Sequence, residues 1–171
     1  MNVLETERLS LRWLTAEDAA FILELVNDPD WLRFIGDRGV RTLEDARGYI
    51  LNGPVAMYQR TGFGLYLVEL KHGARPIGMC GLIERAGLAD IDIGFAFLPA
   101  FRGRGYAYEA ASATMTYARE TLGLARVVAI ASPDNQSSIR LLTKLGLSFE
   151  KMLRLDEDQE EVVLFGWDKP A

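Results

Sequence analysis

Hydrophobic and polar residues alternate with a period of two near the start of the chain. Leu9, Leu11 and Trp13 fall on one face of an extended segment, and the residues between them are polar. This period is typical of a half-buried strand. The pattern therefore predicts a strand over 8–14.

Apolar residues then recur at helical spacing in two segments. The first segment begins after Thr15, a good N-cap residue, and stops at the Asn-Asp-Pro run 27–29. The second begins after Thr42 and ends near the Asn-Gly-Pro run 52–54. The chain is thus expected to continue from the first strand into two helices.

From Gly62 onward, short apolar runs are separated by turn residues. The pattern predicts strands over 63–70, 77–83 and 91–97, a helix over 106–122, a strand over 127–131, a helix over 137–145 and strands over 149–155 and 162–167. The first three of these strands form an antiparallel meander. The last two form a hairpin around the acidic turn 156–159.

The composition supports one folded domain over residues 1–171. The chain is 49% apolar and 25% charged, which is ordinary for a globular protein and excludes disorder for most of it. With the predicted order of elements, this composition indicates a mixed α/β fold. We expect a central sheet of about six to seven strands flanked by helices.

Charge and residue usage exclude several classes of function. The formal net charge of −5 disfavours a nucleic-acid surface, which requires a dense positive face. One cysteine, Cys80, and one histidine, His72, exclude an internal disulfide and leave too few ligands for a zinc site, so no metal is expected. Because no apolar run reaches the length of a membrane span and the start lacks an export signal, we expect a soluble, cytoplasmic protein with no membrane partner.

The segment between the strand 91–97 and the helix 106–122 carries the strongest chemical signal. It contains Gly103 and Gly105, with Arg102 and Arg104 as their neighbours. A glycine-rich turn at a helix N-terminus presents backbone N–H groups and the positive end of the helix dipole. The glycines allow close approach of phosphate oxygens, and the arginines add positive charge. The turn is therefore expected to hold a pyrophosphate.

Three phosphate-binding motifs place a glycine-rich turn before a helix. The Walker form is excluded because no Gly-Lys-Ser/Thr follows the glycines. The dinucleotide form, which would indicate a nucleotide-dependent oxidoreductase, requires a small residue where Tyr108 stands and an acidic residue at the end of the next strand, where the chain has Ala131. The third form, Arg/Gln-x-x-Gly-x-Gly/Ala, is met by Arg102, Gly105 and Ala107. It resembles the acetyl-coenzyme A signature of the GCN5-related N-acetyltransferases (GNAT).

The surrounding sequence resembles the same family over nearly the whole chain. Residues 5–12 resemble the Thr-x-Arg-Leu-x-Leu-Arg opening of the branch that acetylates ribosomal-protein N-termini, the RimJ/RimL-type branch. Residues 92–99 resemble the strand that precedes the coenzyme motif. Residues 134–146 resemble the Asn-x-x-Ser helix and its following glycine. The resemblance implies the GNAT fold and acetyl transfer from acetyl-coenzyme A, used as a co-substrate, to a primary amine.

The resemblance also implies roles for individual residues. The backbone of Phe95, Ala96 and Phe97 would pair with the pantetheine arm, and Asn135 would bond its amide. Ser138 would lie near the coenzyme sulfur. The pyrophosphate would be bound at the turn by Arg102, Gly103, Arg104, Gly105, Tyr106, Ala107 and Tyr108.

One position departs from the pattern of many members of this superfamily. They carry a tyrosine general acid seven residues after the asparagine, where this chain has Leu142. Ser138 then becomes the better candidate to protonate the leaving thiolate. For the amine proton, Asp92 is the first candidate as base, because it is polar within an apolar strand. A backbone N–H around Phe97 would stabilise the developing oxyanion.

Structural alternatives stand beside these roles. Asn135 and Ser138 are also residue types that cap helices, and Asp92 could be an exposed residue on the polar side of its strand. At the level of the whole protein, the alternative to an enzyme is a non-catalytic acyl-coenzyme A sensor. The amine acceptor, whether a protein N-terminus or a small molecule, is left open by the sequence, as is the choice between monomer and homodimer.

Overall fold

The computed structural model describes residues 2–171, and an eight-stranded sheet forms its centre. In chain order the strands are β1 (Asn2–Glu5), β2 (Leu9–Arg12), β3 (Leu65–Leu70), β4 (Arg75–Ile83), β5 (Asp92–Phe97), β6 (Arg126–Ala131), β7 (Ser148–Leu153) and β8 (Val162–Asp168). The α-helices are α1 (Ala19–Val26), α2 (Pro29–Phe34), α3 (Leu43–Ile50), α4 (Ala56–Thr61), α5 (Tyr106–Thr116) and α6 (Gln136–Lys144). Short 3-10 or π segments are η1 (Ala16–Asp18), η2 (Leu51–Val55), η3 (Pro99–Phe101) and η4 (Tyr117–Thr121).

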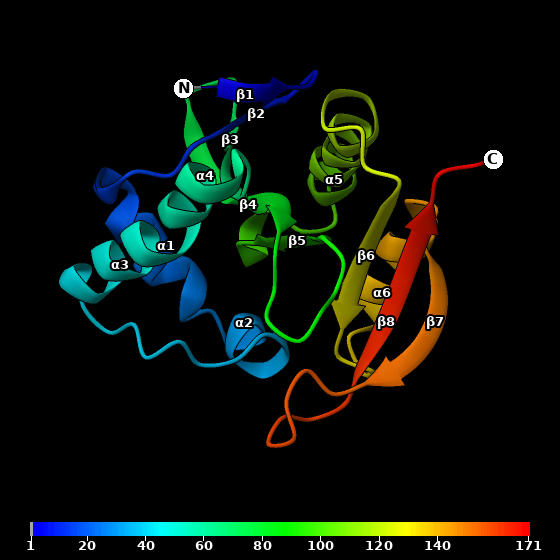
Figure 1. The fold of residues 1–171 in the computed structure, drawn as a ribbon. Coiled ribbons are helices and arrows are strands. Elements are labelled where there is room, and N and C mark those ends of the chain that lie inside the picture. The colour runs from blue at the N-terminus through cyan, green and yellow to red at the C-terminus, as the bar shows by residue number, and fades with distance from the viewer. Residues whose placement is uncertain (1) are drawn as a thin grey trace.

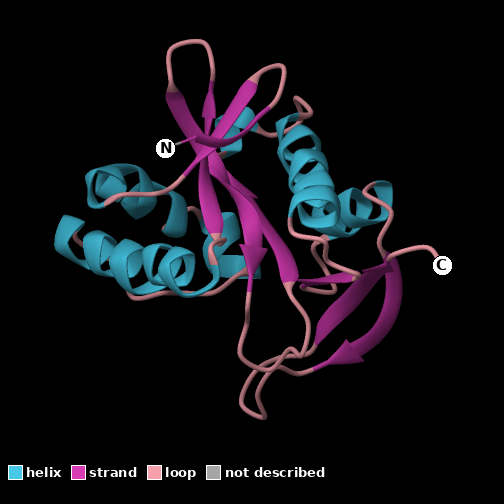
Figure 2. Ribbon diagram, turned by 45° about the horizontal axis from the view of Figure 1, so that its top comes forward, coloured by secondary structure: helices cyan, strands magenta, loops and turns pink. Residues whose placement is uncertain are grey.

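The strands are ordered β1-β2-β3-β4-β5-β6-β8-β7 across the sheet. All neighbours are antiparallel except β5 and β6, which run parallel, so the predicted mixed sheet and helical flanks are confirmed. Figures 1 and 2 show α1, α3 and α4 grouped on one side of the sheet and α5 on the other. The helix α5 connects the two parallel strands, as the crossover of a βαβ unit requires.

The core lies where the predicted meander packs against these helices. Leu11 of β2, Tyr66 and Leu67 of β3, and Met79 of β4 are almost completely buried. The three predicted meander strands are present as β3, β4 and β5, and consecutive ones pair with each other. The first predicted strand is shorter than 8–14, because its regular pairing covers only β2.

Some elements differ from the sequence-based expectation. The edge strand β1 was not predicted, because its four residues are exposed or only partly buried and show no apolar face. The first helix ends at the predicted Asn-Asp-Pro run, because α1 stops at Val26, but a second helix that was not expected begins there. Pro29 opens this helix, α2, where its missing N–H costs no hydrogen bond. The expected helix end at 52–54 is wrong. There a π-helical segment carries Pro54 inside a continuous helical path from α3 to α4.

The second half of the chain follows the predicted order. The helix α5 continues through η4, β6 is largely buried, and α6 leads into the predicted hairpin of β7 and β8. The strand β8 lies between β6 and β7. Among the described residues, no helix combines the length and the apolar character that a membrane span requires.

Candidate functional site

The parallel strands β5 and β6 separate soon after they begin. Their regular pairing is limited to Asp92 opposite Val128, supported by a 3.0 Å hydrogen bond from the Val128 N–H to the Ile91 carbonyl. The other edge of β5, by contrast, pairs with β4 over all of Asp92–Phe97. The sheet therefore has an unpaired backbone edge along the second half of β5.

The phase of the β4 pairing decides which backbone groups of β5 face this gap. Leu98 donates its N–H to the carbonyl of Ile77 over 2.9 Å, and in an antiparallel pair the bonded positions alternate. Ala96 therefore directs its backbone groups to β4, whereas Phe95 and Phe97 direct theirs toward β6. The sequence resemblance implied that Phe95, Ala96 and Phe97 all pair with the pantetheine arm, but only Phe95 and Phe97 present backbone groups to the gap.

The glycine turn has the backbone geometry that glycine permits best. Gly103 and Gly105 have φ values of +73° and +81°, and Gly105 is the N-cap of α5 with no side-chain cap. The first intrahelical bond runs from the Glu109 N–H to the Gly105 carbonyl at 3.0 Å. The amides of 106–108 precede that bond and lie at the positive end of the helix dipole. This turn has the polar groups of an anion-binding site.

Arg102 does not direct its charge freely at the turn. Its guanidinium pairs with Asp28 at 2.7 Å and Asp30 at 2.5 Å, at the start of α2. It also donates two hydrogen bonds, of 3.0 and 2.8 Å, to the carbonyl oxygen of Phe97. Two carboxylates already balance its charge, so Arg102 fixes the turn against α2 and β5.

The aromatic residues of the turn lie on different sides of α5. The Tyr106 ring lies under the Arg8 guanidinium at 4.3 Å, and Lys144 of α6 lies over the Tyr108 ring at 4.1 Å. Arg104 is exposed, and its carbonyl accepts a 3.1 Å hydrogen bond from Arg8. Ala107 is half-buried.

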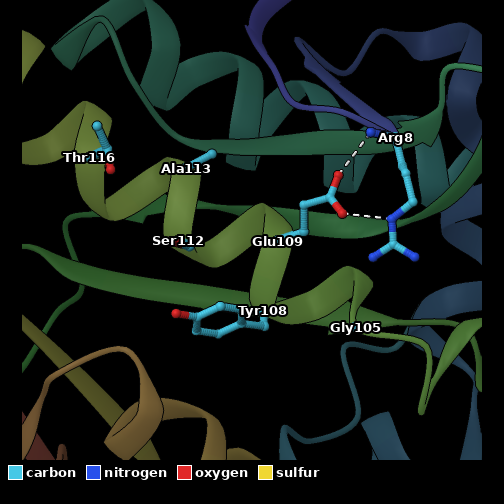
Figure 3. A pocket seen from close by; sticks show the side chains of 7 residues that line it. All are labelled: Arg8, Gly105, Tyr108, Glu109, Ser112, Ala113 and Thr116. Atoms are coloured by element: carbon cyan, nitrogen blue, oxygen red, sulfur yellow. Dashed lines mark hydrogen bonds and ion pairs between the residues drawn. The ribbon is translucent and has the colours of Figure 1, made fainter.

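A groove of about 550 Å³ runs along the exposed side of α5 from the turn (Figure 3). The residues that line it are Arg8, Gly105, Tyr108, Glu109, Ser112, Ala113 and Thr116.

Asn135 and Ser138 lie at the start of α6, directly after β6. Asn135 is the N-cap, and its side-chain oxygen accepts a 3.3 Å hydrogen bond from the Ser138 N–H. Asn135 therefore does cap the helix, which is the structural alternative for this residue. Its side-chain oxygen is used in the cap, whereas the two N–H groups of its side-chain amide remain available as donors. Leu142 is 1% exposed and belongs to the core. Because β5 and β6 are parallel, their carboxyl ends place the glycine turn and the start of α6 at the same edge of the sheet.

Asp92 is a buried carboxylate at the other end of β5. It is 1% exposed, so the alternative of an exposed strand residue is wrong. Arg85 donates to one oxygen over 3.2 Å, and the second oxygen, Oδ1, is buried without a hydrogen-bond partner among the described residues. Burial raises the pKa of Asp92 to about 6, partly offset by the positive charge of Arg85. A carboxyl with this pKa exchanges protons near neutral pH.

Sequence patterns did not reveal the partners of these residues. Arg85 lies in the loop between β4 and β5, and its position in the sequence carries no sign that it would pair with Asp92. Arg8 and Glu109 form an ion pair at 2.7 Å across 101 positions of the chain. Only an alignment in which such positions change together could have indicated these pairs.

The comparisons with known proteins agree with this geometry. The family model of the acetyltransferase (GNAT) domain matches residues 8–148. An uncharacterized N-acetyltransferase of Bacillus subtilis strain 168, YoaA, is 30% identical over 154 residues, which are 89% of this chain and 86% of that protein.

Solved structures share the fold over nearly the entire chain. An acetyltransferase from Agrobacterium tumefaciens strain C58 has a TM-score of 0.83 at 25% identity, covering 99% of this chain and 95% of that one. RimL, a ribosomal L7/L12 alpha-N-protein acetyltransferase in complex with coenzyme A, has a TM-score of 0.78 at 18% identity, covering 99% and 98%. With the family match, the unpaired edge of β5 and the glycine turn, these likenesses identify the chain as an N-acetyltransferase that belongs to the GNAT family.

Proposed function

We propose that this N-acetyltransferase transfers the acetyl group of acetyl-coenzyme A directly to a primary amine, with both substrates bound together. The observation that carries the proposal is the unpaired edge along the second half of β5, which runs from the glycine turn toward Asp92, the buried carboxylate where β5 and β6 still pair. The strand Asp92–Phe97 spans roughly 16 Å at the usual rise of a strand. An extended pantetheine arm along this edge would join a diphosphate at the turn to a thioester nearer Asp92.

The residues present fit each part of this ligand. The turn offers the amides of 103–108 to the diphosphate, and Arg104 adds an exposed positive charge. Phe95 offers its N–H and carbonyl to the arm as an added strand would require. Phe97 offers only its N–H, because Arg102 occupies its carbonyl. The side-chain amide nitrogen of Asn135 is the candidate donor to a pantetheine carbonyl.

Asp92 is the proposed base for the amine. An α-amine has a pKa of roughly 7.7–8.0 and is partly neutral at pH 7, so a weak base acting directly or through water suffices. The orphaned Oδ1 of Asp92 has the acceptor capacity for this proton. A lysine amine, with a pKa of about 10.4, would demand more of the base.

Two negative charges develop during the transfer, one on the thioester oxygen and one on the departing sulfur, and each is assigned to a further group. As the amine attacks, the gap-facing N–H of Phe95 or Phe97 that is not engaged by the pantetheine arm stabilises the negative charge on the thioester oxygen. Ser138 donates a proton to the departing thiolate and recovers one from solvent. Since a thiolate with a pKa near 8.5 leaves readily, this donor accelerates the step without being essential.

The test is an acceptor screen with the purified chain and acetyl-coenzyme A. Peptides with different N-terminal residues and small primary amines are each added, and released coenzyme A is measured with a thiol-reactive dye. Cys80, the only cysteine in the chain, is completely buried and should contribute little background. Release that depends on the amine supports the proposal. Tight binding of acetyl-coenzyme A without turnover on any amine would contradict direct transfer and favour a sensor.

A further inference from the structure

Arg8 lies beside the glycine turn although it comes from the segment before β2. Its Nη1 donates a 3.1 Å hydrogen bond to the carbonyl of Arg104, inside the turn. Its Nη2 is the nearest atom to the open side of Gly105, because a Cβ built there would lie 3.4 Å from it. Figure 3 shows Arg8 at the N-terminal end of α5, beside Gly105. A residue remote in sequence therefore borders the proposed diphosphate site.

The guanidinium of Arg8 is held in place before any ligand binds. Its Nε donates to Glu109 Oε1 over 2.7 Å, and the Arg8 backbone N–H donates to Glu109 Oε2 over 2.9 Å. The Thr6 hydroxyl also donates to Oε2, over 2.5 Å. The Tyr106 ring lies beneath the guanidinium at 4.3 Å. Such fixation lowers the entropy that the side chain loses on binding a ligand.

Arg8 still has donors to offer. A guanidinium carries five N–H groups, and the two bonds to Glu109 and Arg104 use one on Nε and one on Nη1. The side chain is 42% exposed and lines the groove along α5. Both N–H groups of Nη2 can therefore reach a ligand at the turn.

The local electrostatics favour an anion at this place. A cation beside a helix N-terminus is unfavourable, because the dipole is positive there. Arg8 is nevertheless held at the N-terminus of α5, close to Arg104, with Glu109 as its only carboxylate partner among residues 2–171. A diphosphate would be attracted to all of these positive groups and would accept hydrogen bonds from the guanidinium.

We infer that Arg8 is a coenzyme-binding residue that donates from Nη2 to the diphosphate of acetyl-coenzyme A, with Glu109 and Thr6 as its positioning residues. The inference rests on the proposed function, because it assumes that the turn binds this diphosphate. It assigns to the segment before β2 a direct part in coenzyme binding. It also joins the first residues of the sheet to the turn through the ligand.

The first test measures acetyl-coenzyme A affinity by calorimetry in Arg8→Ala and in Arg119→Ala. Arg119 is a matched control, because it is an arginine at the opposite end of the same helical path and stacks on an aromatic ring, Trp167, at 5.7 Å. We expect Arg8→Ala to weaken binding roughly tenfold or more, as for loss of a charge-assisted hydrogen bond, and Arg119→Ala to bind like wild type. Arg8→Lys keeps the positive charge but loses the planar guanidinium with its paired donors, so its affinity should lie between those of Arg8→Ala and Arg119→Ala. This variant also provides the test if Arg8→Ala does not fold.

A second variant separates ligand binding from a purely structural ion pair. Glu109→Gln keeps the shape of the side chain and one of its two oxygen acceptors, removes the negative charge, and leaves the Arg8 guanidinium in the protein. If Arg8 itself binds the diphosphate and Glu109 only positions it, Glu109→Gln should weaken acetyl-coenzyme A binding clearly less than Arg8→Ala does. Equal losses of affinity in Glu109→Gln and Arg8→Ala would overturn the inference, because breaking the pair from either side would then have the same effect.

Dephospho-coenzyme A identifies the phosphate concerned, since it keeps the diphosphate and lacks the 3′-phosphate. The loss in Arg8→Ala should be the same with this probe. A loss that vanishes with dephospho-coenzyme A would overturn the assignment to the diphosphate. Failure of wild type to bind acetyl-coenzyme A would overturn the proposed function itself. Normal wild-type binding with no effect of Arg8→Ala would overturn only the role of Arg8.

Discussion

Arg102 and Phe97 are joined by two hydrogen bonds, of 3.0 and 2.8 Å, from the guanidinium of Arg102 to the carbonyl oxygen of Phe97. This carbonyl points away from β4, into the gap where β5 and β6 separate. The same guanidinium pairs with Asp28 and Asp30. One arginine thus closes the end of the free strand edge and ties it to the start of α2.

Arg102→Ala should lower the free energy of unfolding by about 2 kcal/mol, because it leaves the carboxylate of Asp28, whose side chain is 7% exposed, without the hydrogen bond from its cationic partner. Urea unfolding measures this cost. The double variant with Asp28→Asn should recover part of it, since no buried charge is then unpaired. Equal stabilities of the single and double variants would show that the burial of Asp28 does not limit stability.

Gly105→Val should abolish measurable binding of acetyl-coenzyme A while the protein stays folded. A Cβ at this position would lie 3.4 Å from Arg8 Nη2, on the side proposed for the diphosphate, and the φ of +81° would strain the backbone. Gly73→Val is the matched control, because Gly73 has a φ of +85° in the β3–β4 turn and no heavy atom within 4 Å of its built Cβ. Calorimetry of both variants decides the matter. Loss of binding in Gly73→Val as well would point to a general effect of strain.

Coenzyme binding should protect alternate amides of β5 from hydrogen exchange. The amides of Phe95 and Phe97 face the gap and should exchange more slowly when acetyl-coenzyme A is added. The amide of Ala96 already faces β4 and should change least. Residue-resolved exchange by NMR measures this pattern. Uniform protection of all three amides, or none, would contradict the proposed docking along the strand.

The pH dependence of kcat/KM should report the ionisation of Asp92. Only the ionised carboxylate accepts a proton, so the rate should rise with pH through about 6, the value to which burial raises the pKa. Asp92→Asn should remove this rise at low pH, the acidic limb of the profile, and should lower the rate at pH 7. Arg85→Ala should move the limb to higher pH, because the cation that lowers the pKa is lost.

Arg85→Lys keeps that positive charge and is the control for the pH profile. The rise of kcat/KM with pH in Arg85→Lys should stay close to that of wild type. A limb that is unchanged in Asp92→Asn would assign the amine proton to another group.

Ser138→Ala should lower kcat with little change in acetyl-coenzyme A affinity. Loss of a general acid typically costs roughly 10²–10⁴-fold, and we expect the low end because a thiolate is a good leaving group. The neighbour Ser137 is exposed in the same turn of α6, so Ser137→Ala is the control. Steady-state kinetics with an active amine separates the two. Full activity in Ser138→Ala would leave that serine a residue of the helix start.

Short-range patterns determined much of this protein's architecture. The period-two run 8–14 became β2, the short apolar runs after Gly62 became β3 to β5, and the apolar run 127–131 became most of β6. The glycine turn was also readable from the sequence, because a positive φ and a helix start depend on nearby residues. Elements that lack a buried apolar face show no periodic pattern and could not be predicted in this way. The edge strand β1 is the clearest case, since its residues show no apolar alternation.

Tertiary structure alone decided the charges and hydrogen bonds around the proposed site. The Arg8–Glu109 pair joins residues 101 positions apart, and Arg102 meets Asp28 across 74. Asp92 is one polar residue in an apolar run, and it is buried where β5 lies between β4 and β6, beside Arg85. A local pattern specifies the backbone and its apolar face. Burial and ionic partners depend on which distant segments the topology brings together, and these determine a side chain's pKa and its free donors.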